Sequence, residues 1–221
     1  GFPIGYSGIS QKVLIPAFMA AYSDQSADNI GLDVFKTIPR PNWRITYDGF
    51  SRIPFFQKYF SSFVIGHGYR SSFNINSFIT NFDTIGTAQY PNGDFIPKYD
   101  IQQVSITESF GPLISIDATW KNSILTRFDI KKDRTIALSF ANNQVTEIKG
   151  TEYTVGLGYR MKQFKIPFKI NKKQIKLDND LDLKFDFGWR KSFTVIRRII
   201  ENINQASAGT NSITISFTAD Y

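Results

Sequence analysis

The chain contains no cysteine and only one histidine, His67, among its 221 residues. Without cysteine it forms neither a disulfide framework nor a thiolate metal site, and one histidine does not make a histidine-rich zinc site. Glycine and proline are present in ordinary numbers, 15 and 9, so the sequence is neither low-complexity nor disordered. These absences remove many classes of enzyme, and we expect no cofactor.

Long apolar runs are also missing. The longest, from Val13 to Tyr22, has ten residues and contains Pro16, whereas a membrane helix needs about 18 or more. The chain therefore either does not cross a membrane or crosses it as strands. It begins at Gly1 without a basic n-region, an apolar h-region or a cleavage site, so we expect a mature product or an internal fragment.

Aromatic residues, by contrast, are abundant at 15% of the chain, and 21 of them are phenylalanine. The net charge is +7, with the basic excess concentrated in 162–176 and 190–198. A basic surface attracts nucleic acid or anionic headgroups, but lysine-rich turns more often protect exposed sheet edges. We therefore expect no nucleic-acid partner.

The most informative segment is 180–190, Asp-Leu-Asp-Leu-Lys-Phe-Asp-Phe-Gly-Trp-Arg, which alternates without a break. Successive side chains of a strand point to opposite faces. One face carries Leu181, Leu183, Phe185, Phe187 and Trp189, and the other carries Asp180, Asp182, Lys184, Asp186 and Arg190. A strand of about ten residues, rising about 3.3 Å per residue at a tilt near 45°, spans about 25 Å, the height of the apolar band of an outer-membrane barrel.

Similar alternation elsewhere predicts an all-β fold, an antiparallel meander of about ten long strands of the kind found in outer-membrane β-barrels. Short connections such as Gly111-Pro112 and Lys131-Lys132-Asp133 indicate tight turns between antiparallel neighbours. Only 77–100 is a long loop. The predicted strands are 43–48, 62–76, 101–110, 113–121, 124–131, 134–142, 151–162, 177–190, 192–200 and 211–221.

Residues 1–42 contain frequent glycine and proline and no sustained alternation, which predicts irregular structure. Residues 52–60 predict a short amphipathic helix or interfacial turn, with Pro54 in its first turn. The expected organisation has two parts. Residues 1–60 form an irregular entry or connecting segment with one short strand, and residues 61–221 form transmembrane wall strands.

Three patterns that resemble functional motifs are better explained by strand structure. Gly66-His-Gly-Tyr-Arg70 and Gly156-Leu-Gly-Tyr-Arg160 lack the third glycine of a dinucleotide loop and lie inside strands. Each places its glycines and its arginine on one face and its tyrosine on the other. The aspartates at 178, 180 and 182 resemble a calcium loop, but Leu183 and Trp189 stand where that loop needs glycine and glutamate.

His67 is in phase with Phe63 and Ile65 on the apolar face. The nearest hydroxyl on that face beyond Tyr69 is Ser71, about 13 Å away along the strand, which is outside the reach of a base and its nucleophile. An interfacial histidine explains the position better than a lipase-like pair does. We therefore expect the chain not to be an enzyme.

Seven stretches carry a resemblance to a known family, in the same order as in that family: 15–22, 31–39, 41–49, 67–73, 156–161, 166–169 and 179–187. They resemble the C-terminal portion of the SprA/Sov family, and Pro41-Asn-Trp-Arg-Ile-Thr-Tyr-Asp-Gly49 is the most specific of them. The family forms the outer-membrane translocon of the type 9 secretion system in Bacteroidota, a very large barrel that exports folded proteins. Family members are many times longer, so the resemblance implies that the meander is part of a large outer-membrane β-barrel, as a fragment of its wall.

The resemblance implies that the chain resides in the outer membrane and contacts lipid, the remaining strands of the same barrel, secreted cargo, and shuttle and plug proteins of the PorV type. Together with the alternation, it assigns the two faces of the wall. We expect Arg70, Arg160, Asp182, Lys184, Asp186 and Arg190 to face the lumen. We expect Trp120, Tyr159, Leu183, Phe185, Phe187 and Trp189 to face lipid or a partner.

Two other functions fit the residues. A small passive porin or lipid-handling barrel would need a complete product of this length and a closing strand pair. A soluble all-β binding module would use the exposed aromatics for glycans or the basic turns for nucleic acid, but the length of the alternating runs argues against it.

Overall fold

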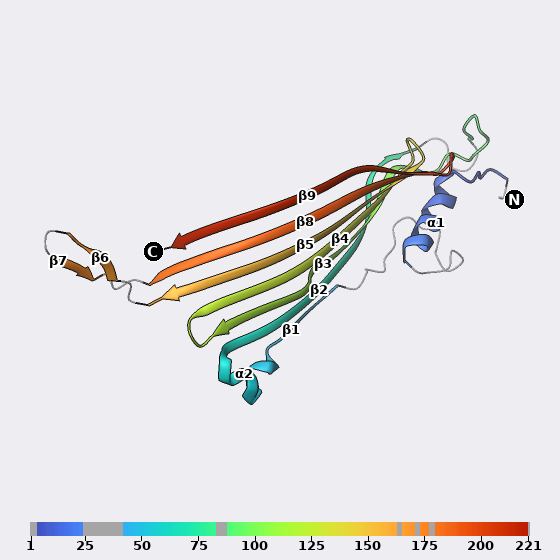
Figure 1. Cartoon of the computed structure of the whole chain (residues 1–221). Helices are drawn as coiled ribbons and strands as arrows, with labels where there is room; N and C mark the ends of the chain where they lie inside the picture. Colours follow the sequence, from blue (N-terminus) through green and yellow to red (C-terminus); the bar gives the residue numbers. More distant parts are fainter. Residues whose placement is uncertain are drawn as a thin grey trace.

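The computed structural model describes residues 4–23, 42–82, 88–162, 165–170, 173–176 and 180–220. Seven strands form one long, curved antiparallel sheet (Figure 1). The antiparallel meander predicted from the sequence is confirmed. The strands of the sheet are β1 (Trp43–Tyr47), β2 (Phe60–Thr80), β3 (Tyr99–Trp120), β4 (Ile124–Ser139), β5 (Gln144–Met161), β8 (Leu181–Arg198) and β9 (Ile203–Asp220).

Each strand of the sheet pairs with the strand before it, in the order β1-β2-β3-β4-β5-β8-β9. The connection from β5 to β8 contains a separate hairpin of β6 (Lys165–Ile170) and β7 (Lys173–Lys176), which projects away from the sheet (Figure 1). Among the described strands, none joins β9 to β1 or β2. The sheet therefore has two open edges.

Three predicted strand boundaries were wrong, because the residues concerned lie inside long strands. Gly111 and Pro112 lie in β3, where the pairing with β4 shifts between Phe110 and Ile114, so they form a bulge and not a turn. Lys191 continues β8 without interruption. The described residues therefore form seven strands in the sheet, most of them longer than predicted, and not about ten.

The charged stretch 131–133 is the third corrected boundary and lies in the middle of β4. Lys131 forms a 3.0 Å salt bridge with Glu152 of β5, and Asp133 lies 3.2 Å from Arg190 of β8. Partners on the adjacent strand β5 and on β8, the strand beyond it, thus balance charges that resemble a turn when the chain is read alone.

Helix α1 (Gln11–Ser23) lies in the segment predicted to be irregular. Its apolar residues Leu14, Ile15, Phe18 and Met19 recur at helical spacing and are 5–9% exposed. They pack against strand residues to form the core of the structure. The strand members of this core are Ile101, Val104, Ile106, Ile136, Leu138 and Val145.

The predictions for 43–60 agree with the structure. β1 occupies the first predicted strand, and a 3-10 turn, η2 (Gly49–Arg52), leads into the short helix α2 (Pro54–Tyr59). Within 1–60 the described residues, 4–23 and 42–60, thus include two helices, a 3-10 turn and the strand β1, and are more regular than expected; the rest of the predicted irregular segment, 1–3 and 24–41, lies outside the described residues. None of the helices in the described part of the chain is long and apolar enough to cross a membrane.

Candidate functional site: an apolar band and a charged face on one sheet

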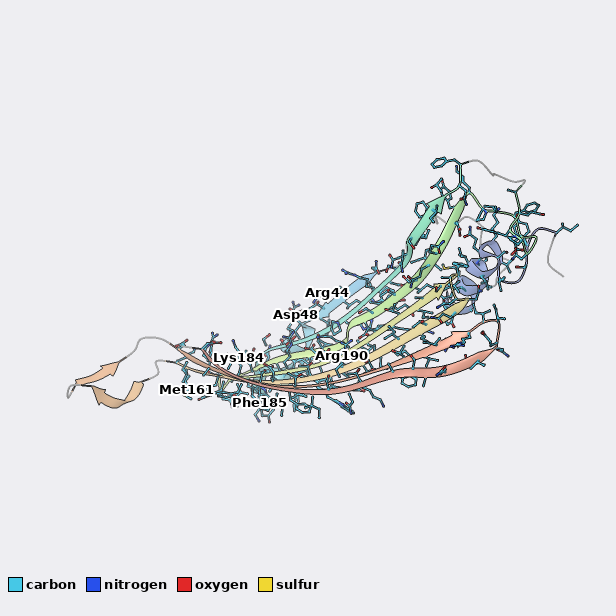
Figure 2. All side chains as sticks on the ribbon, turned by 90° about the horizontal axis from the view of Figure 1, so that it is seen from above. Arg44, Asp48, Met161, Lys184, Phe185 and Arg190 are labelled. Atoms are coloured by element: carbon cyan, nitrogen blue, oxygen red, sulfur yellow. The ribbon has the colours of Figure 1, made fainter. Side chains whose placement is uncertain are left out.

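The register of the sheet arranges its side chains in rows, because directly paired residues of neighbouring strands point to the same face. On β8, Phe185 pairs with Leu157 of β5 on one side and with Phe217 of β9 on the other. The adjacent residue Lys184 points to the opposite face, as Figure 2 shows. This alternation holds through the part of the sheet that lies far from α1.

Four successive rows on one face form a continuous surface, here called the apolar band. None of its residues is aspartate, glutamate, lysine or arginine, and many of its large side chains are 36–68% exposed. The band consists of Ile45 and Tyr47; Phe60, Phe63, Ile65 and His67; Ile114, Ile116, Ala118 and Trp120; Ile124, Thr126, Phe128 and Ile130; Tyr153, Val155, Leu157 and Tyr159; Leu183, Phe185, Phe187 and Trp189; and Ile213, Ile215, Phe217 and Ala219.

The two polar side chains within the band other than tyrosine and tryptophan are bonded internally. His67 Nδ1 lies 2.7 Å from the carbonyl of Leu113 in the β3 bulge. The hydroxyl of Thr126 accepts a 3.1 Å hydrogen bond from Trp120 Nε1 and donates to the carbonyl of Ala118. His67 Nδ1 and the Thr126 hydroxyl therefore have hydrogen-bond partners within the sheet, which lowers the cost of placing them in an apolar surrounding.

Aromatic rings mark both limits of the band. At one limit Phe60 and Trp120 pack with their centroids 4.3 Å apart. At the other, Trp189 stacks on Tyr153 at 5.6 Å, and Trp43 lies 4.6 Å from Tyr69. Trp189 Nε1 also donates a 2.5 Å hydrogen bond to Asn211, in the next row. This is the aromatic distribution found at both interfaces of membrane barrels.

The height of this surface fits a bilayer. The next row beyond Trp189 introduces lysines, at Lys132 and Lys191. On β8 the four rows of the band run from Leu183 to Trp189, about 20 Å along the strand and about 15 Å after a tilt of roughly 40°. The whole interval from Leu181 to the first lysine of this face, Lys191, is ten residues, about 33 Å along the strand and about 25 Å after the same tilt.

The opposite face of the same strands, here called the charged face, carries ion pairs that join different strands. Arg160 holds Asp182 by two hydrogen bonds of 2.7 and 2.9 Å. Arg190 bonds both Glu152 and Asp133 at 3.0–3.2 Å. Lys184 pairs with Asp220 at 3.2 Å. The face is polar but its charges are largely balanced locally.

The twelve residues proposed from the sequence fall into two sets on opposite faces. Arg70, Arg160, Asp182, Lys184, Asp186 and Arg190 lie on the charged face. Trp120, Tyr159, Leu183, Phe185, Phe187 and Trp189 lie in the apolar band. Arg70 and Asp186 form no ion pair with another described residue, and Arg70 lines a shallow hollow with Arg44, Gly68 and Gly111.

A second cluster was not expected from the sequence. Glu147 lies on the same face as the band, but beyond it, under α1, and is 1% exposed. Burial alone would raise its pKa, but hydrogen bonds from Lys149, Arg134 and Arg197 outweigh burial and lower the pKa from 4.5 to about 2. The predicted strand began at residue 151, so this position was not assigned to a face.

Within the described residues, no group of three or more histidine, cysteine, aspartate or glutamate side chains is placed to hold a metal ion. His67 packs between Trp43 and Phe110, with ring centroids 6.4 and 6.0 Å away. No protein-family model matches the chain, and no curated protein matches it.

Proposed function

We propose that this chain is part of the wall of a large outer-membrane β-barrel, with the apolar band in lipid and the charged face toward a water-filled lumen. The observation that carries the proposal is the band itself, which crosses all seven strands without a charge. From strand spacing and rise its area is on the order of 700 Å², which exceeds the exposed apolar patches of ordinary soluble monomers.

The open edges support a larger barrel. β9 has 18 residues and pairs only with β8 among the described strands, and β1 covers only five residues of β2. Unpaired backbone groups at such edges are costly in lipid, where no water replaces the missing hydrogen bonds. Additional strands on both sides would satisfy these edges, and the chain would then be a wall segment.

The charged face suits contact with water and passing protein. Its paired charges keep the surface wetted, and it offers a moving polypeptide no continuous apolar surface to which it would adhere. Because the sequence resembles the SprA/Sov family, we propose that the barrel is the protein-conducting channel of a type 9 secretion system. Its partners would be the secreted cargo and the shuttle and plug proteins of such a system.

The first experiment is to raise an antibody against residues 88–98, which precede β3, and to blot the outer-membrane fraction. We expect a band far above the 25.2 kDa of this chain. Depletion of that protein should stop the export of folded cargo. A heat-modifiable band near 25 kDa would instead support a small passive porin, and recovery in the soluble fraction would support a soluble binding module.

A further inference from the structure

A group of exposed aromatic rings lies directly before β2 in the chain and extends the apolar band at that end of the strand. It belongs to η2 and α2, which we call the aromatic turn (residues 49–59). The turn lies at the end of the sheet opposite to α1 (Figure 1). It therefore adjoins the limit of the band that Phe60 and Trp120 mark.

The aromatic turn is fixed to the sheet by hydrogen bonds. Ser51 Oγ donates to the carbonyl of Phe63 at 3.0 Å and accepts from its amide at 2.8 Å. The amide of Lys121, just after β3, donates to the carbonyl of Tyr59 at 3.1 Å. A helix of six residues is not stable alone in water, so these contacts hold its position.

Aromatic packing joins the turn directly to the band. The ring of Phe56 lies 4.8 Å from Phe63, 5.9 Å from Phe60 and 5.4 Å from Phe50. Phe60 and Phe63 belong to the band. The apolar surface of the turn is therefore continuous with it.

The outer side of the turn is apolar, and no element of the described part of the chain covers it. Phe55 is 66% exposed, and Ile53 and Tyr59 are 42–43% exposed. Among the described residues, the Phe55 ring packs on the neighbouring rings Phe56 and Tyr59, with centroids 5.7 and 5.6 Å away. Exposed rings on a fixed turn beside an apolar band indicate a surface that binds lipid or another molecule.

The charges of the turn indicate what kind of molecule this surface binds. Residues 49–59 contain Arg52 and Lys58 and no aspartate or glutamate. Lys58 Nζ lies 5.4 Å from the centre of the Tyr59 ring. Cations beside exposed aromatic rings are typical of segments that lie in a lipid headgroup region, where the cations meet phosphate and the rings lie just below it.

We propose that the aromatic turn is a membrane anchor that lies in the headgroup region of one leaflet, with Phe55 and Ile53 below the phosphates and with Arg52 and Lys58 at their level. This inference rests on the proposed function, because it needs the apolar band to be in lipid. It adds a lipid-binding site outside the strands, which would fix the depth of the wall in the bilayer.

Labelling at single sites tests the anchor, because the chain has no cysteine of its own. A spin label is attached to Phe55→Cys in the intact protein, reconstituted into bilayers that contain anionic phospholipid. Collisions with lipid-soluble oxygen and with a water-soluble nickel chelate are compared. Phe187→Cys, in the middle of the band, is the lipid reference, and Ala17→Cys, on the exposed side of α1, is the aqueous reference.

We expect the label at 55 to favour oxygen over nickel, at a depth between those of the two references. If nickel is favoured at 55 while oxygen is favoured at 187, the proposal of a membrane anchor is wrong, but the proposal that the strands form a barrel wall is still supported. If both reagents are excluded at 55, a protein covers the turn and the anchor is again wrong. If nickel is favoured at 187 as well, the proposed function fails and the anchor fails with it.

Discussion

Arg197 of β8 donates a 2.6 Å hydrogen bond to Glu147 of β5 under helix α1. Its other terminal nitrogen donates at 2.7 Å to the hydroxyl of Tyr22, on α1. Arg134 approaches the same carboxylate at 2.7 Å and lies 5.4 Å from the Tyr22 ring. Glu147 thus collects the cations of three strands at the point where the helix docks, and it links α1 to the part of the sheet beyond the apolar band.

Replacing Glu147 with alanine should loosen α1 from the sheet. The change leaves Arg134, Arg197 and Lys149 close together without their shared counterion, and breaking such a buried pair costs about 3 kcal/mol. Amide hydrogen exchange in α1 should therefore become about 100-fold faster. Glu152→Ala, which removes a carboxylate from the charged face, should change α1 exchange by less than about threefold, and equal effects would contradict this role of Glu147.

Acid should release the same contact. Because the pKa of Glu147 is lowered to about 2, its contribution to stability is complete above about pH 4.5 and is lost as the pH falls toward 2. We expect the difference in α1 exchange between the native protein and Glu147→Gln to be large at pH 7, unchanged at pH 5 and nearly absent near pH 2. Comparing the two proteins at each pH removes the intrinsic pH dependence of exchange. A difference that already disappears between pH 7 and 5 would refute the assignment.

The two faces of the sheet were predictable from sequence, because a strand alternates with a period of two and antiparallel pairing keeps neighbouring strands in phase. Leu183 and Tyr159 are far apart in sequence but pair directly. Both fell on the apolar face when each strand was read alone. Short connections predicted antiparallel neighbours for the same reason.

Features that depend on distant partners were not predictable. Helix α1 contains Pro16, and its stability comes from packing on β3, β4 and β5, which follow it by many residues. The charges of 131–133 resembled a turn because their partners, Glu152 and Arg190, lie on other strands. Glu147 has the parity of the apolar face, and only the docked helix explains its burial.

The close approach of β2 and β3 beside the bulge should tolerate only glycine at position 68. A Cβ atom at Gly68 would lie 3.2 Å from the carbonyl oxygen of Gly111, a backbone atom that does not yield easily. Gly68→Val should therefore reduce stability by about 1–3 kcal/mol, measured as a lower unfolding midpoint of the assembled protein. Gly188→Val is the matched control, since the nearest atoms there are 3.8 Å away. Equal losses for the two variants would show that the approach at Gly68 is not limiting.

The assignment of the faces to lipid and to lumen predicts opposite responses to a new charge. Phe185→Arg or Phe187→Arg places a guanidinium in the middle of the apolar band and should destabilise the barrel in bilayers by about 2–4 kcal/mol each. Asp182→Asn breaks only a solvent-screened ion pair with Arg160 and should leave assembly near the native level.

Ser216→Arg is the control matched for size and charge. Ser216 lies on β9, directly opposite Asp186 on the charged face, so the new guanidinium gains a nearby carboxylate and remains in water. The measurement is the fraction of each variant that assembles in the outer membrane in a heat-modifiable form. If the apolar band faces lipid, Phe185→Arg and Phe187→Arg should lose most of their assembly. Asp182→Asn and Ser216→Arg should assemble at near-native levels. If Ser216→Arg lost assembly and Phe187→Arg did not, the charged face would be the one in lipid.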